Sequence, residues 1–249
     1  LVIRGRDSIL HHAVSKIMGS IESVLLWPLP DGDEVSKAQH GCIDCLALMI
    51  CAELQCENVN RIRLSTYGQG AARYSVLTYV IHQLTSAKNE FISPSVAPAT
   101  HCLPFRLCMA NVLISACQKI SDSCKNPLAR ETLPCLTQAI PAMAGSEVRA
   151  ACIQVLFSCV CHLKSAVLPY APDLLKISLK LLNKGSEKEK MASAKLLGSL
   201  MASEDAVVGS ISGELLEARA ALSSIALSDP SVTVRQLCHQ LSSCLLLPS

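Results

Sequence analysis

The stretch LPCLTQAIPAMAGSEVRAACIQVLFSCVCHL, residues 133–163, decides the fold. Its apolar residues recur every three or four positions on both sides of a short break at 144–147, which predicts two helices. Because the break is short, the two helices must fold back on each other as an antiparallel hairpin. A single hairpin cannot bury all of its apolar surface, so we expect similar hairpins to stack on it. The stripe of the second helix consists of Cys152, Val155, Leu156, Cys159, Val160 and Leu163.

The composition favours packed helices and excludes several other classes of protein. Half of the 249 residues are hydrophobic, only 3% are aromatic, and the net charge of +2 gives no general argument for nucleic-acid binding. No uninterrupted apolar run reaches the roughly 18–20 residues of a membrane span, and the longest, 150–163, contains polar residues. The opening LVIRGRDS is charged where a signal peptide needs an apolar core. The chain begins at Leu1 rather than Met, which is compatible with a segment of a longer protein.

The fourteen cysteines are interpreted as reduced thiols. Disulfide-dense secreted proteins are small and rich in loops, and this chain has neither property. We therefore expect an intracellular protein of the cytoplasm or nucleus. Five cysteines fall at expected buried-face positions of helices, where cysteine acts as a small hydrophobic residue: Cys45, Cys108, Cys117, Cys152 and Cys159.

Helical periodicity extends along most of the chain, and no segment has the alternation of a strand. We expect 55–68 to be turn-like, 88–104 to be an irregular proline-containing segment, and 121–127 to be a loop. The fold class is therefore all-α. The helices that we expect, besides the hairpin at 133–163, are 8–27, 34–54, 70–87, 105–120, 173–182, 187–201, 213–226 and 232–247.

A basic residue opens the second helix of successive hairpins. Arg149, Lys190 and Arg235 each follow a short turn, and the steps between them are 41 and 45 residues. Counting backwards from Arg149, further basic residues occur at similar intervals: Arg106, Arg73 and Lys37. Periods of about 40–47 residues are typical of two-helix repeats.

These hairpins resemble HEAT repeats, an armadillo-related family of helical repeats. The family motif, a turn followed by Val-Arg and an Ala-rich helix, is matched by GSEVRAA at 145–151 and by DPSVTVR at 229–235. The middle repeat departs from it, with Glu189-Lys190 in place of Val-Arg. The resemblance implies a right-handed α-solenoid of five to six hairpins over a single domain, 1–249. Its half at 1–128, with a Pro-rich stretch at 89–104, is irregular, and 129–249 is more regular.

The candidate binding residues are mostly basic. In HEAT repeats residues such as Arg149 and Arg235 usually pair with acids of the adjacent repeat, and contact with a ligand is the alternative. Between 164 and 195, seven lysines stand against three acidic residues, which suits either a solvated helix face or an acidic partner. The only tryptophan is expected to pack, or else to anchor a partner. The resulting set is Trp27, Arg149, Lys176, Lys180, Lys184, Lys188, Lys190 and Arg235.

Signatures of catalysis or cofactor binding are missing from the sequence. There is no phosphate-binding glycine loop and no nucleophile or metalloprotease motif. Cys42 and Cys45 have the spacing of half a zinc site, but they fall in the middle of an expected helix, without the turns that such sites use. We therefore expect no catalytic residue, no metal and no cofactor.

The function that we expect is that of a non-enzymatic scaffold or adaptor that binds other proteins, with nucleic acid disfavoured. Because LSSCLLL at 241–247 and the opening LVI are apolar, we expect further repeats or a partner to cover one end. The alternative is a tubulin-binding TOG domain. That resemblance implies binding through Trp27, Arg149, Lys188, Lys190 and Arg235, although Pro28-Leu29-Pro30 replaces the charged continuation of that family. A cargo groove like that of importins is a weaker alternative, because its ladder of Trp and Asn is missing.

Overall fold

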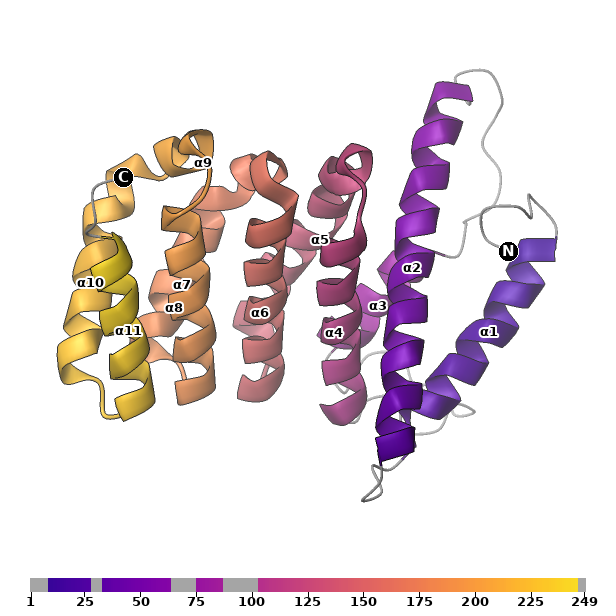
Figure 1. The fold of residues 1–249 in the computed structure, drawn as a ribbon, viewed down its shortest axis with the longest axis horizontal. Coiled ribbons are helices and arrows are strands. Elements are labelled where there is room, and N and C mark those ends of the chain that lie inside the picture. Colours follow the sequence, from indigo (N-terminus) through magenta and orange to yellow (C-terminus); the bar gives the residue numbers. More distant parts are fainter. Residues whose placement is uncertain (1–8, 28–32, 64–74, 87–102, 246–249) are drawn as a thin grey trace. The chain divides into compact units, whose positions relative to one another are not determined.

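The computed structural model describes residues 9–27, 33–63, 75–86 and 103–245. Every regular element in these ranges is a helix, so the all-α prediction is confirmed for the described chain (Figure 1). The chain divides into two compact units, Leu1–Leu128 and Ala129–Ser249. This division falls where the irregular half of the sequence gives way to the more regular one. The expectation of a single repeat domain stays a prediction, and each unit is described by itself.

The first unit contains four long helices: α1 (Ile9–Leu25), α2 (Asp33–Arg63), α3 (Val76–Thr85) and α4 (Leu103–Lys119). Helix α2 packs against each of the other three, and α3 also packs against α4. Large apolar side chains from α2, α3 and α4 are buried between them, among them Leu46, Leu84 and Phe105. A 3₁₀ turn, Asp122–Cys124, follows α4.

Side chains from neighbouring helices cap both ends of α3. The carboxylate of Glu53 on α2 accepts hydrogen bonds from the backbone N–H groups of Val76 (2.9 Å) and Leu77 (3.4 Å). At the other end, the guanidinium of Arg106 on α4 donates two hydrogen bonds to the carbonyl of Leu84 (2.7 and 3.0 Å). Because helix ends leave backbone groups without partners, these contacts fix the position of α3 between α2 and α4.

The second unit contains most of α5 (Lys125–Ala139), followed by α6 (Ser146–Leu163), α7 (Ala171–Lys184), α8 (Glu187–Met201), the short α9 (Asp205–Ser210), α10 (Leu215–Ser228) and α11 (Val232–Leu245). Short 3₁₀ segments lie between some of them, at Ile140–Ala142, Lys164–Tyr170 and Ser212–Glu214. The pairs α7–α8 and α10–α11 are helical hairpins, as their positions in the sequence predict (Figure 1).

The helices of the second unit pack in two rows. Helix α8 lies against α6 on one side and against α11 on the other, and α7 lies against α10. The second helices α6, α8 and α11 therefore contact one another in turn, and the first helices α7 and α10 contact each other. Helices α8 and α11 approach closely at Gly198, where an added Cβ would lie 2.8 Å from Leu241 Cδ2 and would displace the end of that side chain.

Helix α6 is apolar and mostly buried. Among the described residues, the run Ser146–Lys184 is long and apolar enough to cross a membrane by length and composition alone, with a mean hydropathy of 1.7 over an 18-residue window. This run is longer than the apolar run expected from the sequence, which ended at Leu163. However, 61% of that window is buried inside the protein, and a backbone φ of 53° at Lys164 separates α6 from the segment leading to α7. The apolar surface of α6 is thus that of a core helix.

The structure corrects three details of the sequence-based assignment. Helix α2 continues to Arg63, so the prediction of a turn-like segment is wrong for residues 55–63. The predicted loop at 121–127 is a 3₁₀ turn followed by the start of α5 at Lys125. Cys45 is exposed on α2 and Cys108 is half-buried, whereas Cys117, Cys152 and Cys159 are buried as predicted. Arg73 and most of the Pro-rich stretch lie outside the described residues.

Candidate partner-binding site

An ion pair links the start of α6 to the start of α8. The Arg149 Nε donates to Glu189 Oε1 over 2.5 Å, and Arg149 Nη1 donates to the carbonyl of Met143 over 2.5 Å. Only 1% of the Glu189 side chain is exposed, against 24% for Arg149. Arg149 therefore ties the turn before its own helix to the acid of the next hairpin, which is the ion-pair interpretation made from the sequence.

Glu189 has a second role as the end of a capping box. Its Oε2 accepts a hydrogen bond from the backbone N–H of Ser186 (2.7 Å), and the Ser186 hydroxyl accepts one from the Glu189 backbone. Burial opposes ionisation of this carboxyl, but the hydrogen bonds from Arg149 and Ser186 outweigh it and lower the pKa of Glu189. The side chain is thus an anion with its partners already in place.

A second ion pair links α8 to the turn before α11. Lys190 Nζ lies 2.6 Å from Asp229 Oδ2, and the two side chains are 16% and 2% exposed. Burial raises the pKa of Asp229. The Lys190 ammonium, the Ser231 backbone N–H and Arg235 together lower it by more, so the net shift of this pKa is downward. Arg235 Nη1 also donates to the carbonyls of Asp229 (2.5 Å) and Pro230 (3.1 Å). Arg235 therefore braces its own turn.

More exposed contacts run beside these two buried pairs. Lys188 Nζ lies 2.6 Å from Glu147 Oε1, and the Ser231 hydroxyl donates to Glu187 Oε1 over 2.8 Å. In all four contacts between turns, the partners are 39 to 44 residues apart in the chain. We call this set of contacts the turn ladder: Glu147–Lys188, Arg149–Glu189, Lys190–Asp229 and Glu187–Ser231.

Four of the eight predicted binding residues are therefore engaged within the protein. Arg149 and Lys190 hold buried carboxylates, Arg235 binds backbone carbonyls, and Lys188 has an exposed pair. These four residues hold turns of the protein in place. Arg149 and Lys190 are partly buried by these contacts, so little of either side chain is accessible to a partner.

The three lysines of α7 are different. Lys176, Lys180 and Lys184 are exposed, and no ion pair or hydrogen bond joins their ammonium groups to any described residue. The opposite face of α7 is buried, through Leu174, Leu175 and Leu182. The three ammonium groups therefore share a solvent-facing side of α7 and remain available for an external anion.

A shallow pocket of about 150 Å³ opens beside this row. Ile140 and Pro141 from the turn after α5 face Ile177 and Leu181 on α7, and these four apolar residues line part of the pocket. Arg149, Lys180, Lys184, Gly185 and Glu189 complete the lining. The pocket thus combines apolar walls with three cations and one anion, and it unites three of the predicted binding residues.

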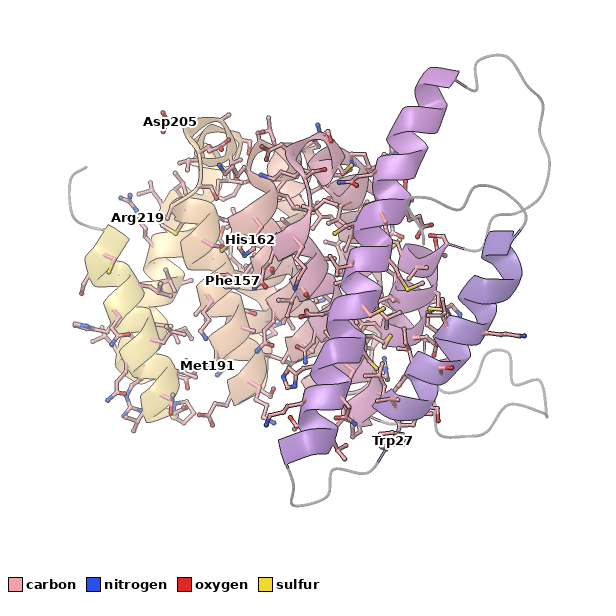
Figure 2. The ribbon with its side chains drawn as sticks, turned by 45° about the vertical axis from the view of Figure 1, so that its right-hand side comes forward. Trp27, Phe157, His162, Met191, Asp205 and Arg219 are labelled. Atoms are coloured by element: carbon pink, nitrogen blue, oxygen red, sulfur yellow. The ribbon has the colours of Figure 1, made fainter. Side chains whose placement is uncertain are left out.

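Trp27 is the one predicted binding residue in the first unit. It lies just after α1, where 48% of its surface is exposed, and its carbonyl accepts a hydrogen bond from the Gln39 side chain (3.1 Å) (Figure 2). Its exposure is compatible with the anchoring role predicted from the sequence.

The sequence did not single out the acids of the turn ladder or the apolar walls of the pocket. Glu147, Glu189 and Asp229 each stand about 40 residues from a basic partner. A search for opposite charges separated by the repeat step would have found them. No comparable signal marks Ile140 and Ile177, because their proximity arises only when the turn after α5 meets α7.

The described residues include no group of three or more histidines, cysteines or acids arranged to hold a metal ion. Burial raises the pKa of Cys51 and Cys161, and it raises the pKa of Cys238 to about 11, with a smaller contribution from the nearby Asp229 anion. These three thiols are therefore held in the weakly nucleophilic protonated form.

Comparisons with protein-family models, with curated proteins and with solved structures produced no match to this chain. The assignment of this chain to a class of protein therefore rests on its helices and on the contacts between their turns.

Proposed function

We propose that this chain is a HEAT-like helical-repeat scaffold, a non-enzymatic protein that binds other proteins inside the cell. The observation that carries the proposal is the turn ladder. Side chains at equivalent places of successive hairpins contact one another at intervals of 39 to 44 residues, which is the behaviour expected of stacked repeats.

The departure of the middle repeat from the HEAT motif is consistent with this interpretation. Glu189 stands where the motif has Val, and it receives the Arg149 of the preceding hairpin. Lys190 stands where the motif has Arg, and it binds Asp229 of the following hairpin. The middle hairpin thus connects both neighbours, which explains why it carries one acid and one base.

A scaffold also needs surface that its own packing leaves open. Lys176, Lys180 and Lys184 provide a charged surface on α7. The last hairpin exposes large apolar side chains, since Leu216 and Leu227 on α10 are 79% and 85% exposed and Val232 at the start of α11 is 55% exposed. These side chains favour the prediction that a partner or further repeats cover this end.

The TOG-like alternative draws on the same turns, and no specific observation favours it. It would use Arg149 and Lys190 to contact tubulin, yet both already hold buried carboxylates.

The experiment is quantitative affinity purification with the full chain as bait. The wild-type bait is compared with K176E/K180E/K184E and with a control of equal charge change, K164E/K195E/R219E. The control residues are also exposed and unpaired among the described residues, and they lie outside the pocket. Arg219 is marked on α10 in Figure 2.

We expect the wild-type and control baits to retain a common set of proteins, part of which the α7 variant loses. Retention of no protein above empty beads would reject the scaffold proposal. Microtubule pelleting with the wild type and with K188E/K190E tests the alternative, which requires tubulin binding that depends on the turns.

A further inference from the structure

We propose that the pocket beside α7 binds an acidic segment of a partner protein, with one apolar side chain seated between Ile140 and Ile177 and carboxylates on Lys180 and Lys184. The inference rests on the proposed scaffold function, and it specifies where the partner binds and what chemistry it presents.

The size of the pocket selects a single side chain. Its volume of about 150 Å³ is well below that of a typical cofactor site. An apolar cavity of about this volume accommodates a benzene-sized group, which is comparable to one large apolar side chain. Ile140 is 1% exposed and forms a fixed apolar wall, whereas Ile177 and Leu181 are half-buried. An apolar group placed here would remove Ile177 and Leu181 from water.

The charges around the pocket select an acidic segment. Glu189 is neutralised by Arg149, so the net charge offered to a ligand comes from Lys180 and Lys184, with Lys176 one turn further along α7. Residues four apart in a helix are separated by about 6 Å along its axis. Alternate residues of an extended strand are separated by about 6.6 Å. An extended segment with acidic residues at every second position can therefore place successive carboxylates on successive lysines.

The same features disfavour a nucleic acid. A single strand is usually bound through aromatic side chains that stack on its bases, and the pocket lining includes no aromatic residue.

The test uses a fluorescein-labelled 12-residue peptide that alternates Glu and Ser around one central Leu. Two comparison peptides replace that Leu with Ser, or every Glu with Gln, and a labelled 12-nucleotide oligo(dT) represents nucleic acid. Binding to the full chain is measured by fluorescence anisotropy at about 0.15 M salt, where exposed charges further apart than about 8 Å are largely screened. The protein variants are K180E/K184E, the matched control K164E/K195E, and I177Q.

We expect the Leu-containing acidic peptide to bind the wild type and the control equally. K180E/K184E should weaken binding at least about tenfold, because each carboxylate would then face a like charge. I177Q and the loss of the peptide Leu should each weaken it several-fold, since the apolar contact is lost. All changed residues are at least partly exposed, and circular dichroism confirms that each variant is folded.

Three results would overturn the inference: no binding of the acidic peptide, binding insensitive to K180E/K184E, or oligo(dT) binding that exceeds peptide binding. Its failure can be distinguished from failure of the scaffold proposal. If a K180E/K184E bait retains the same partners as the wild type, the scaffold proposal stands and the pocket inference fails. A bait that retains no protein rejects the scaffold proposal itself.

Discussion

The two units use their charged residues in different ways. In the second unit, charges stand at the turns and reach across to the next hairpin, where Glu189 and Asp229 are almost fully buried. In the first unit, Glu53 and Arg106 cap the two ends of one helix, α3, and the pair between Lys119 and Asp44 is much more exposed. Contacts repeated at one interval can hold any number of similar hairpins, whereas the caps of α3 serve one particular helix. This difference matches the regular and irregular halves of the sequence.

The largest effect should come from acid, because it removes both buried anions of the turn ladder together. The pKa values of Glu189 and Asp229 are lower in the folded protein than their ordinary values, so the unfolded chain binds more protons near pH 4. The stability that these groups contribute is complete above about pH 5 and is lost as the pH falls through the lowered values.

Hydrogen exchange followed by mass spectrometry between pH 6 and pH 3, corrected for the intrinsic exchange rate, measures this loss in α6, α8 and α11. The variant E189Q/D229N should be less stable at pH 6 and should depend less on pH than the wild type. A dependence as steep in the variant as in the wild type would assign acid sensitivity to other carboxyl groups.

Breaking one buried pair should have the next largest effect. R149M leaves the carboxylate of Glu189 buried without its cation, and removing one partner of a buried pair destabilises a protein by about 3 kcal/mol. We expect faster hydrogen exchange in α6 and α8, together with a lower midpoint of urea unfolding. The double variant R149M/E189M serves as control, since it leaves no unpaired buried charge and should recover the part of the stability that does not come from the Glu189 capping box. If R149M lost less than about 1 kcal/mol, the pair would behave as an exposed one.

Removing a cap in the first unit should have an intermediate and local effect. R106M withdraws the two hydrogen bonds at the end of α3, and hydrogen bonds from a charged donor are worth about 1.5–3 kcal/mol. Exchange should accelerate in α3 and leave α8 unchanged. R106K, which retains one possible donor to the Leu84 carbonyl, should lose less. Equal acceleration in both units would contradict the division into separate units.

The smallest effect should come from the exposed pair of the first unit. K119M removes the cation 2.8 Å from Asp44, whose side chain is 57% exposed. Exposed pairs contribute about 0–1 kcal/mol, so we expect a change in the urea midpoint close to the error of measurement. Comparison with R149M then isolates burial as the variable. A loss in K119M as large as that in R149M would show that the difference between the two units is not one of burial.

The identity of most helices and of the hairpin turns could be predicted because these features are local. Apolar residues at intervals of three and four occur within each segment, and α8 begins and ends at the residues that its pattern indicates, Glu187 and Met201. Helix α2 was predicted too short because its final residues, beginning near Glu57, are polar. The helix continues there although only Val59 and Ile62 carry the apolar spacing onward among these polar residues.

The sequence by itself determined that this protein is all-α and that a basic residue opens the second helix of each C-terminal hairpin. Only the tertiary structure decided what those basic residues do. In the sequence, Arg149 and Lys190 look like Lys180 and Lys184, because all four are cations close to the end of a helix. The two pairs of cations differ because Arg149 and Lys190 have acidic partners, Glu189 and Asp229. These partners lie about 40 residues away in the sequence and come close only when the hairpins pack together. Whether a charge is held inside the protein or left available to a partner depends on packing between segments, which a local pattern does not encode.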